Sequence, residues 1–354
     1  MDELKNKEFR ALYAPDYHLL AKSEKERLIA ELAAQYGLKI KGFQEFCRFG
    51  KSIYTAILEK DGSEFVFVPG AKIRLGWQGK AEDFSRETLE DMADTFLAME
   101  ESEDEDMDEW DDEKIEQRIA AKIKEPAFLK QITDYFNEYT SEPEEVLIHP
   151  LFVERYYQES CWETVEQTEI AKHKNWLEAA HQAEANCSYI EIDQEVRLWL
   201  NGKDIKAKQY REISFEQLKQ QVEEEGYFLP TRREWEYFAG GGCDTLFAWG
   251  NDMDFSLVLR NINDFGLARE EKIYSLEESN FFGLVLAHDP YEREIVYDEQ
   301  FSYKGGDGGC NVCGGLGMVL GYFPASPYYQ DPQEEMGENV NGGFDFFRKV
   351  IRIA

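Results

Sequence analysis

The sequence YFLPTRREWEYFAGGGCDTLFAWGND, at residues 227–252, is the stretch that decides the fold. Thr231 is followed three residues later by Glu234, which is the spacing of a capping box, so a short helix is predicted to begin there. Trp235 and Phe238 lie three residues apart and therefore share one face of that helix. Three glycines are predicted to end the helix, and an aromatic turn follows. The pattern indicates a capped helix that holds an aromatic core together.

The composition indicates a large folded chain with a strongly acidic surface. Its 354 residues allow one large domain or two of ordinary size, and 43% hydrophobic residues are enough for a substantial core. The formal net charge is −33, and the eleven acids between residues 100 and 113 account for only a third of it. Such a surface repels nucleic acid and anionic membranes, because binding to either requires Lys and Arg. It would attract a basic partner, so we expect either a solubilising acidic surface or a basic protein partner.

The sequence carries no visible signal for export or membrane insertion. Residues 1–10, MDELKNKEFR, contain no apolar segment of the kind a signal peptide needs. No apolar run reaches the roughly 18 residues of a membrane span. The cysteines are scattered instead of spaced as a secreted disulfide framework; they are Cys47, Cys161, Cys187, Cys243, Cys310 and Cys313. These features predict a reducing, cytoplasmic environment.

Residues 1–60 are predicted to form a small, mainly helical N-terminal lead. Ser23 and Glu26 have capping-box spacing, and the apolar residues after them keep helical periodicity as far as Gly37. A second helical segment is expected near residues 42–49.

The main domain is predicted to span residues 61–354. It begins beside a hairpin in which Asp61 and Gly62 join two apolar strands. An acidic, helix-prone insertion is expected at about residues 80–145, with its helical periodicity interrupted at Pro126. Like-charged blocks of this kind are usually disordered or form a solvated helix face.

Beyond the insertion, apolar runs and capping signals define the remaining elements. Four further strands are expected, at residues 146–156, 280–287, 294–297 and 342–352. Two helices are expected in addition to the one after Thr231, at residues 162–182 and after the capping box of Ser214 and Gln217. The fold class is therefore α+β.

Six short words resemble, in the same order, those of the formylglycine-generating enzyme (sulfatase-modifying factor) family. They are FVFVPG with LG at residues 65–76, LPT with EWEY at 229–237, WGN at 249–251, N-x-FGL at 280–284, KGG at 304–306 and GF at 343–344. The resemblance covers about residues 65–76 and 146–353. It implies a loop-rich fold related to C-type lectins, in which N- and C-terminal strands meet.

The resemblance also implies a chemistry for Cys310 and Cys313. Oxidase members of the family hold copper(I) with two cysteines and convert a substrate cysteine to formylglycine. Soft thiolates suit copper(I), and Cys310 stands where the family has its first cysteine. The second cysteine comes three residues later instead of five, Lys304 replaces an arginine, and Asp307 replaces a serine. These replacements favour a divergent, non-catalytic member.

Metal sites of the family are matched only in part. Asn261 and the carbonyl of Ile262 match part of a calcium site, whereas HDPYEREIVYD at residues 288–298 does not keep the other one. The iron-dependent relatives need three histidines. The five present do not form that pattern; they are His18, His149, His173, His181 and His288.

A CxxC pair can serve as half of a metal site, as a redox pair, or as two thiols without chemistry. Because glycines flank Cys310 and Cys313, we expect the pair in a tight loop and not at the start of a helix. Residues expected to contact a ligand near this loop are Lys304, Asp307, Asn311 and Arg348. The alternative for Arg348, as for Arg232 and Arg233, is an ion pair with an internal carboxylate.

Three functions follow as hypotheses. The first is a cytoplasmic, non-catalytic binding module for a basic protein, such as an inhibitor of a basic toxin, with function carried by loops on a rigid scaffold. The second is a copper-dependent oxidase that uses Cys310 and Cys313. The third is a calcium-stabilised carbohydrate binder.

Overall fold

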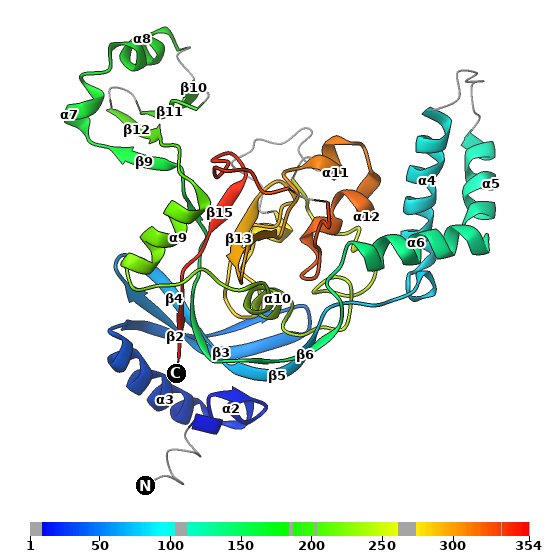
Figure 1. The fold of residues 1–354 in the computed structure, drawn as a ribbon, viewed down its shortest axis with the longest axis horizontal. Coiled ribbons are helices and arrows are strands. Elements are labelled where there is room, and N and C mark those ends of the chain that lie inside the picture. The colour runs from blue at the N-terminus through cyan, green and yellow to red at the C-terminus, as the bar shows by residue number, and fades with distance from the viewer. Residues whose placement is uncertain are drawn as a thin grey trace.

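A five-stranded antiparallel sheet organises the chain (Figure 1). This computed structural model describes residues 9–102, 112–183, 187–192, 194–201, 204–260, 274–333 and 335–353. In order across the sheet the strands are β16 (Val350–Arg352), β7 (Leu151–Glu154), β4 (Ser63–Val68), β3 (Lys51–Lys60) and β2 (Lys39–Arg48). Strands from both halves of the sequence therefore build one layer.

Local signals explain part of this sheet. Asp61 and Gly62 both adopt positive φ, 52° and 84°, as a two-residue hairpin between β3 and β4 requires. The helix expected near residues 42–49 is wrong, because residues 42–48 belong to β2 and pair with β3, and Phe49 lies in the turn that follows. Pairing with a neighbouring strand outweighs the weak local preference for a helix.

The N-terminal residues cover one face of this sheet. They form β1 (Tyr13–Ala14), α2 (Asp16–Leu19) and α3 (Lys22–Tyr36). Leu28, Ile29 and Ala33 of α3 are buried. The expected capping box is displaced: Ala21 is the N-cap, and its N–H donates to the Glu24 carboxylate at 2.9 Å.

The acidic region at residues 80–145 forms helices, as the sequence indicates. They are η1 (Ala81–Asp83), α4 (Arg86–Ser102), α5 (Asp112–Lys122) and α6 (Pro126–Glu138), and they connect β5 (Gly70–Leu75) to β6 (Glu144–Ile148). Helices α4 and α5 project from the body (Figure 1). Helix α6 anchors them to the body, because its residues Phe128, Ile132 and Phe136 belong to the main core. Most of the acidic block lies outside the described residues.

A second sheet of four strands stands above the first. Its order is β14 (Phe301–Lys304), β13 (Arg293–Tyr297), β15 (Asp345–Phe347) and β8 (Gln158–Glu159). The closing strand expected at residues 342–352 is in fact two strands, β15 and β16, that belong to different sheets. Arg348 and Lys349 form the corner between them.

Two helices with confirmed capping boxes pack beside these sheets. Ser214 caps α9 (Phe215–Glu224), and Thr231 caps α10 (Arg232–Gly240). Trp235 and Phe238 of α10 are fully buried, with ring centroids 6.1 Å apart. The opening stretch therefore forms the predicted capped helix in an aromatic core.

The strand expected at residues 280–287 is wrong. The side chain of Asn280 builds a turn there instead: its Oδ1 accepts N–H groups of Phe282 and Leu284, and its Nδ2 donates to the Phe238 carbonyl at 2.7 Å. A side chain that satisfies backbone groups in this way competes with strand pairing.

Residues 162–210 form a projecting lobe with a core of its own (Figure 1). It contains β9 (Trp162–Val165), α7 (Gln167–Ile170), α8 (Lys174–Gln182), β10 (Tyr189–Ile192), β11 (Val196–Asn201) and β12 (Asp204–Tyr210). The single helix expected at residues 162–182 is therefore a strand and two short helices. The lobe's sheet has the order β10-β11-β12-β9, and Trp176 of α8 is buried against it.

Within the described residues the chain is a mixed α+β structure with eleven α-helices and four small sheets. None of these helices combines the length and apolar character that a membrane crossing demands.

Candidate functional site

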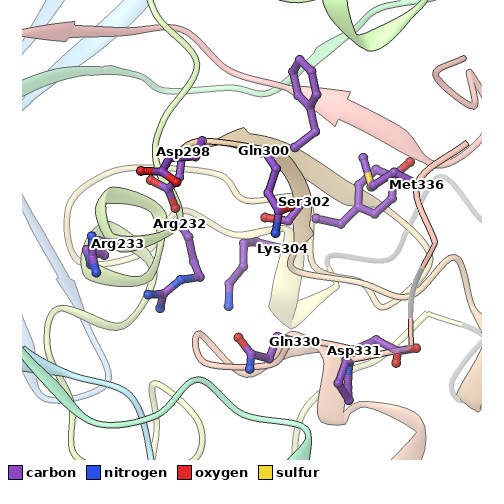
Figure 2. A pocket seen from close by; sticks show the side chains of 13 residues that line it. Arg232, Arg233, Asp298, Gln300, Ser302, Lys304, Gln330, Asp331 and Met336 are labelled. Atoms are coloured by element: carbon purple, nitrogen blue, oxygen red, sulfur yellow. The ribbon is translucent and has the colours of Figure 1, made fainter. Parts of the chain in front are cut away.

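A pocket of about 860 Å³ opens between the β13–β14 hairpin and the segment around Gln330. Figure 2 shows Gln300 and Ser302 on the hairpin side, with Gln330 and Asp331 facing them from the opposite side. The first turn of α10 brings Arg232 and Arg233 to one end of the pocket. Three separate segments of the chain thus supply the walls.

The cations at this pocket already have carboxylate partners. Arg232 bonds to Glu144 at 2.6 Å and to Glu236 at 3.0 Å, and Arg233 bonds to Glu144 at 2.8 Å. Lys304 Nζ is buried, 3.0 Å from Glu236 Oε1, and donates to a backbone carbonyl at 2.6 Å. Burial lowers the pKa of Lys304, whereas the neighbouring Glu236 raises it. These three cations are therefore held by the protein itself.

Three carboxylates at the pocket are in a different situation. Asp298 and Glu299, in the hairpin turn, are exposed, and Asp331 is half-buried. Among the described residues none of the three has an ion-pair partner, although Asp331 accepts the N–H of Gln333 at 2.8 Å. The apolar lining beside them includes Phe301, Pro332 and Met336. The pocket therefore offers negative charge beside apolar surface.

The cysteine pair lies on a short helix, α11 (Cys310–Cys313), and not in the tight loop that its glycines predict. Asp307 builds the turn before this helix, because its carboxylate accepts the N–H groups of Gly309 at 2.8 Å and Asn311 at 3.0 Å. Burial raises the pKa of Asp307. Asn311 in turn donates to the Leu320 carbonyl at 3.1 Å. Asp307 and Asn311 thus shape the turn that carries the thiols.

Both thiols of the pair are exposed. All six cysteines lie in described segments, and each is outside a disulfide. Cys313 Sγ lies 3.3 Å from the Tyr291 hydroxyl, and this hydrogen bond raises the pKa of Tyr291 to about 12. Two thiolates one helical turn apart form a soft donor pair that fits copper(I). In the part of the chain that the structure describes, no third His, Cys, Asp or Glu joins them as a metal ligand.

The other residues expected to contact a ligand are dispersed. Arg348 is fully buried in the corner between β15 and β16, where it pairs with Glu294 and donates to the Glu154 and Val285 carbonyls. Lys304 borders the pocket, but its ammonium group is buried. Asn261 and Ile262 lie outside the described residues.

Tyr135 connects the pocket with the cysteine turn and was not singled out from the sequence. Its ring stacks on Tyr139 at 4.9 Å, four residues later on α6. Burial raises the pKa of Tyr135 to about 12, with further contributions from Tyr139, Asp307 and Asp331. Asp307 belongs to the cysteine turn and Asp331 to the pocket. Because both carboxylates contribute to the raised pKa of Tyr135, the turn and the pocket are neighbours. The sequence signal that could have identified it is the spacing of Tyr135 and Tyr139, which lie four residues apart and so share one helix face.

Comparison with known proteins finds no relative of this chain. No protein-family model, no curated protein and no solved structure matches the chain. The functional argument therefore rests on the residues themselves.

Proposed function

We propose that the chain is a divergent member of the formylglycine-generating enzyme family, with its C-type lectin-like fold. Support comes from contacts that join several of the words that carry the resemblance, or residues directly beside them. Asn251 Oδ1 accepts from Trp77 Nε1 at 3.1 Å, beside the first word. Lys304 bonds to Glu236 of the second word. Asn280, of the fourth, bonds to the helix that follows Thr231. Segments far apart in sequence thus meet in one core.

For its function, we propose a non-catalytic binding module that takes a basic segment of a partner protein at the pocket of about 860 Å³. The observation that carries this proposal is the contrast between the pocket's charges. Its cations form ion pairs with internal carboxylates, whereas Asp298, Glu299 and Asp331 form none with the described residues. Asp298 lies close enough to Arg233 and Arg352 to raise their pKa values, so Glu299 and Asp331 carry most of the contrast. Met336 and Phe301 supply apolar surface for the methylene stem of a Lys or Arg side chain. The net charge of −33 would speed the encounter.

The test compares two variants of equal net charge. One carries Asp298→Asn, Glu299→Gln and Asp331→Asn. The control neutralises three exposed acids elsewhere, in Glu82→Gln, Glu87→Gln and Glu178→Gln. Binding of lysine-rich and arginine-rich peptides is measured by isothermal titration calorimetry at low and high salt.

The pocket variant is expected to lose at least about tenfold more affinity than the control, because it alone removes contacts at the site. Its salt dependence should also become shallower. Equal, small losses in both variants would show that the peptides bind the general negative field, and the pocket would then not be the site.

Copper(I) chemistry at Cys310 and Cys313 is a second candidate, favoured by two exposed thiols on one helical turn. The two sulfurs would hold the ion, which would supply one-electron chemistry with oxygen when bound. Asp307 would keep the turn in place, and Tyr291 would donate a hydrogen bond to Cys313.

A competition titration against a copper(I) chelator tests this candidate without an activity assay. One equivalent should bind to the reduced protein, and Cys310→Ala should abolish binding. Cys243→Ala, at a buried thiol, is the control and should bind as the unmodified chain does. Failure of the reduced chain to compete with a weak chelator would exclude this function.

A further inference from the structure

The outer face of the lobe's sheet carries two exposed aromatic rings. Tyr189 of β10 and Trp199 of β11 are cross-strand partners, with ring centroids 5.5 Å apart and planes at 57°. Their exposed fractions are 41% and 38%, so both rings are open to solvent. The inner face of the same sheet is closed by α7 and α8, which bury Ile170 and Trp176. The exposed pair is therefore not part of the lobe's core.

A hollow of about 670 Å³ adjoins these rings. Besides Tyr189 and Trp199 its lining includes Ser188, Asn201, Asp204 and Lys206. Lys206 is the cross-strand partner of Trp199, so ring and ammonium group stand side by side on the same face. A concave surface with aromatic walls and a few polar groups has the size and composition of a small-ligand site.

Charges on this face are balanced, unlike those of the chain as a whole. Arg197 pairs with Glu159 at 2.6 Å and with Glu191 at 3.3 Å, and Lys208 also pairs with Glu159. Among the described residues that line the hollow, one carboxylate, Asp204, is matched by one ammonium group, Lys206. The face therefore attracts neither cations nor anions strongly.

These observations favour one class of ligand. Pyranose rings present flat C–H faces that stack on aromatic rings and hydroxyl groups that bond to amides, carboxylates and ammonium groups. The hollow exceeds the volume of a single sugar residue, and its two tilted rings match a short chain better than a flat molecule. A protein partner would need roughly 800 Å² of surface, far more than two rings provide. A second copy of the chain would bring another charge of −33.

We propose that the lobe binds a neutral oligosaccharide at Tyr189 and Trp199, with Lys206 and Asn201 donating hydrogen bonds to sugar oxygens and Asp204 accepting them from sugar hydroxyls. This site is separate from the pocket at Asp298 and does not depend on the function proposed there. The aromatic pair also contributes to the stability of the β10–β11 hairpin, so the experiment must separate binding from folding.

The test uses the full chain and a panel of neutral hexasaccharides, namely β-1,4-glucan, α-1,4-glucan, xylan, mannan and chitin fragments, by saturation-transfer NMR and calorimetry at millimolar concentration. At least one should bind, and Trp199→Ala should weaken it at least about tenfold. Asp204→Ala, which leaves both rings in place, should weaken binding as well, although it does not disturb the hairpin's aromatic pair. Tyr156→Ala, at another exposed aromatic residue, should have no effect.

Circular dichroism and proteolysis of the lobe check that each variant remains folded. The proposal is wrong if no member of the panel binds, or if Trp199→Ala and Asp204→Ala, both folded, bind as well as the unmodified chain. Preferential binding of an acidic hexasaccharide would also overturn it, because it would assign the site to Lys206 alone. A dimer that Trp199→Ala dissociates in sedimentation would identify the face as an interface between copies.

Discussion

The buried ion pair behind the pocket makes a quantitative prediction for Glu236→Gln. Glu236 is 0% exposed and Lys304 is 1% exposed, and their charged groups lie 3.0 Å apart. Removing the carboxylate's charge leaves a buried ammonium group beside the like charge of Arg232, which also lowers its pKa. Breaking one side of a buried pair costs about 3–5 kcal/mol of unfolding free energy. We expect a loss in this range at neutral pH.

The control is the same chemical change at the surface. Glu225 pairs with Lys349 at 2.5 Å, but its side chain is 54% exposed. Exposed ion pairs contribute about 0–1 kcal/mol, so Glu225→Gln should be nearly neutral. Urea denaturation followed by far-UV circular dichroism gives both values.

The pH dependence of Glu236→Gln supplies an independent check. Glu236 raises the pKa of Lys304, and burial lowers it, so the variant's folded-state pKa should fall further below the unfolded value of 10.5. Between these two pKa values the unfolded chain binds more protons than the folded one, and stability therefore rises with pH. The difference in unfolding free energy between the unmodified chain and the variant should therefore shrink between neutral pH and about pH 10. An equal cost for Glu236→Gln and Glu225→Gln, or a deficit that grows with pH, would refute the reasoning.

Three further predictions concern stability and are read by thermal or urea unfolding. Thr231→Ala removes an N-cap bond of 3.1 Å and should cost about 1 kcal/mol; no loss would show that the cap is replaceable. Gly305→Ala should lower the unfolding free energy several-fold more than Gly308→Ala does. Both glycines have positive φ, but only at Gly305 would the new Cβ lie 2.1 Å from a backbone oxygen. Equal losses would contradict this. Burial raises the pKa of Glu292 from 4.5 to about 7, so the folded chain holds a proton that the unfolded chain has lost, and stability falls as pH rises across this window. Glu292→Gln should flatten that slope, and an unchanged slope would exclude Glu292 as its source.

Local chemistry explains what could be predicted from the sequence. The capping box of Thr231 and Glu234 needs only residues three apart, and the hairpin at Asp61 and Gly62 needs only two residues that tolerate positive φ. Both are present where the sequence predicts them. The sequence allows Arg232 and Arg233 either a ligand or an internal carboxylate as partner, and both form ion pairs with internal carboxylates.

Distant partners explain what could not be predicted. Residues 42–48 become part of a strand because β3 is available beside them. Residues 310–313 become a helix because the Asp307 carboxylate holds the preceding turn. The pocket combines Arg232, the 298–304 hairpin and Asp331, and no periodicity links segments that far apart. The outward position of Trp199 depends on the register of β11 with β10 and β12, which no local signal in the sequence sets.

The position of β16 has a consequence for how the chain is made. This strand pairs with β7, which lies some two hundred residues earlier, and Ile353 donates to the Pro150 carbonyl at 3.0 Å. Hairpins β2–β3 and β3–β4 can form as soon as they leave the ribosome. The edge of β7 stays open until residues 350–353 have been synthesised, and an open strand edge invites pairing with other chains. Nascent molecules should therefore expose this edge until residues 350–353 have left the ribosome.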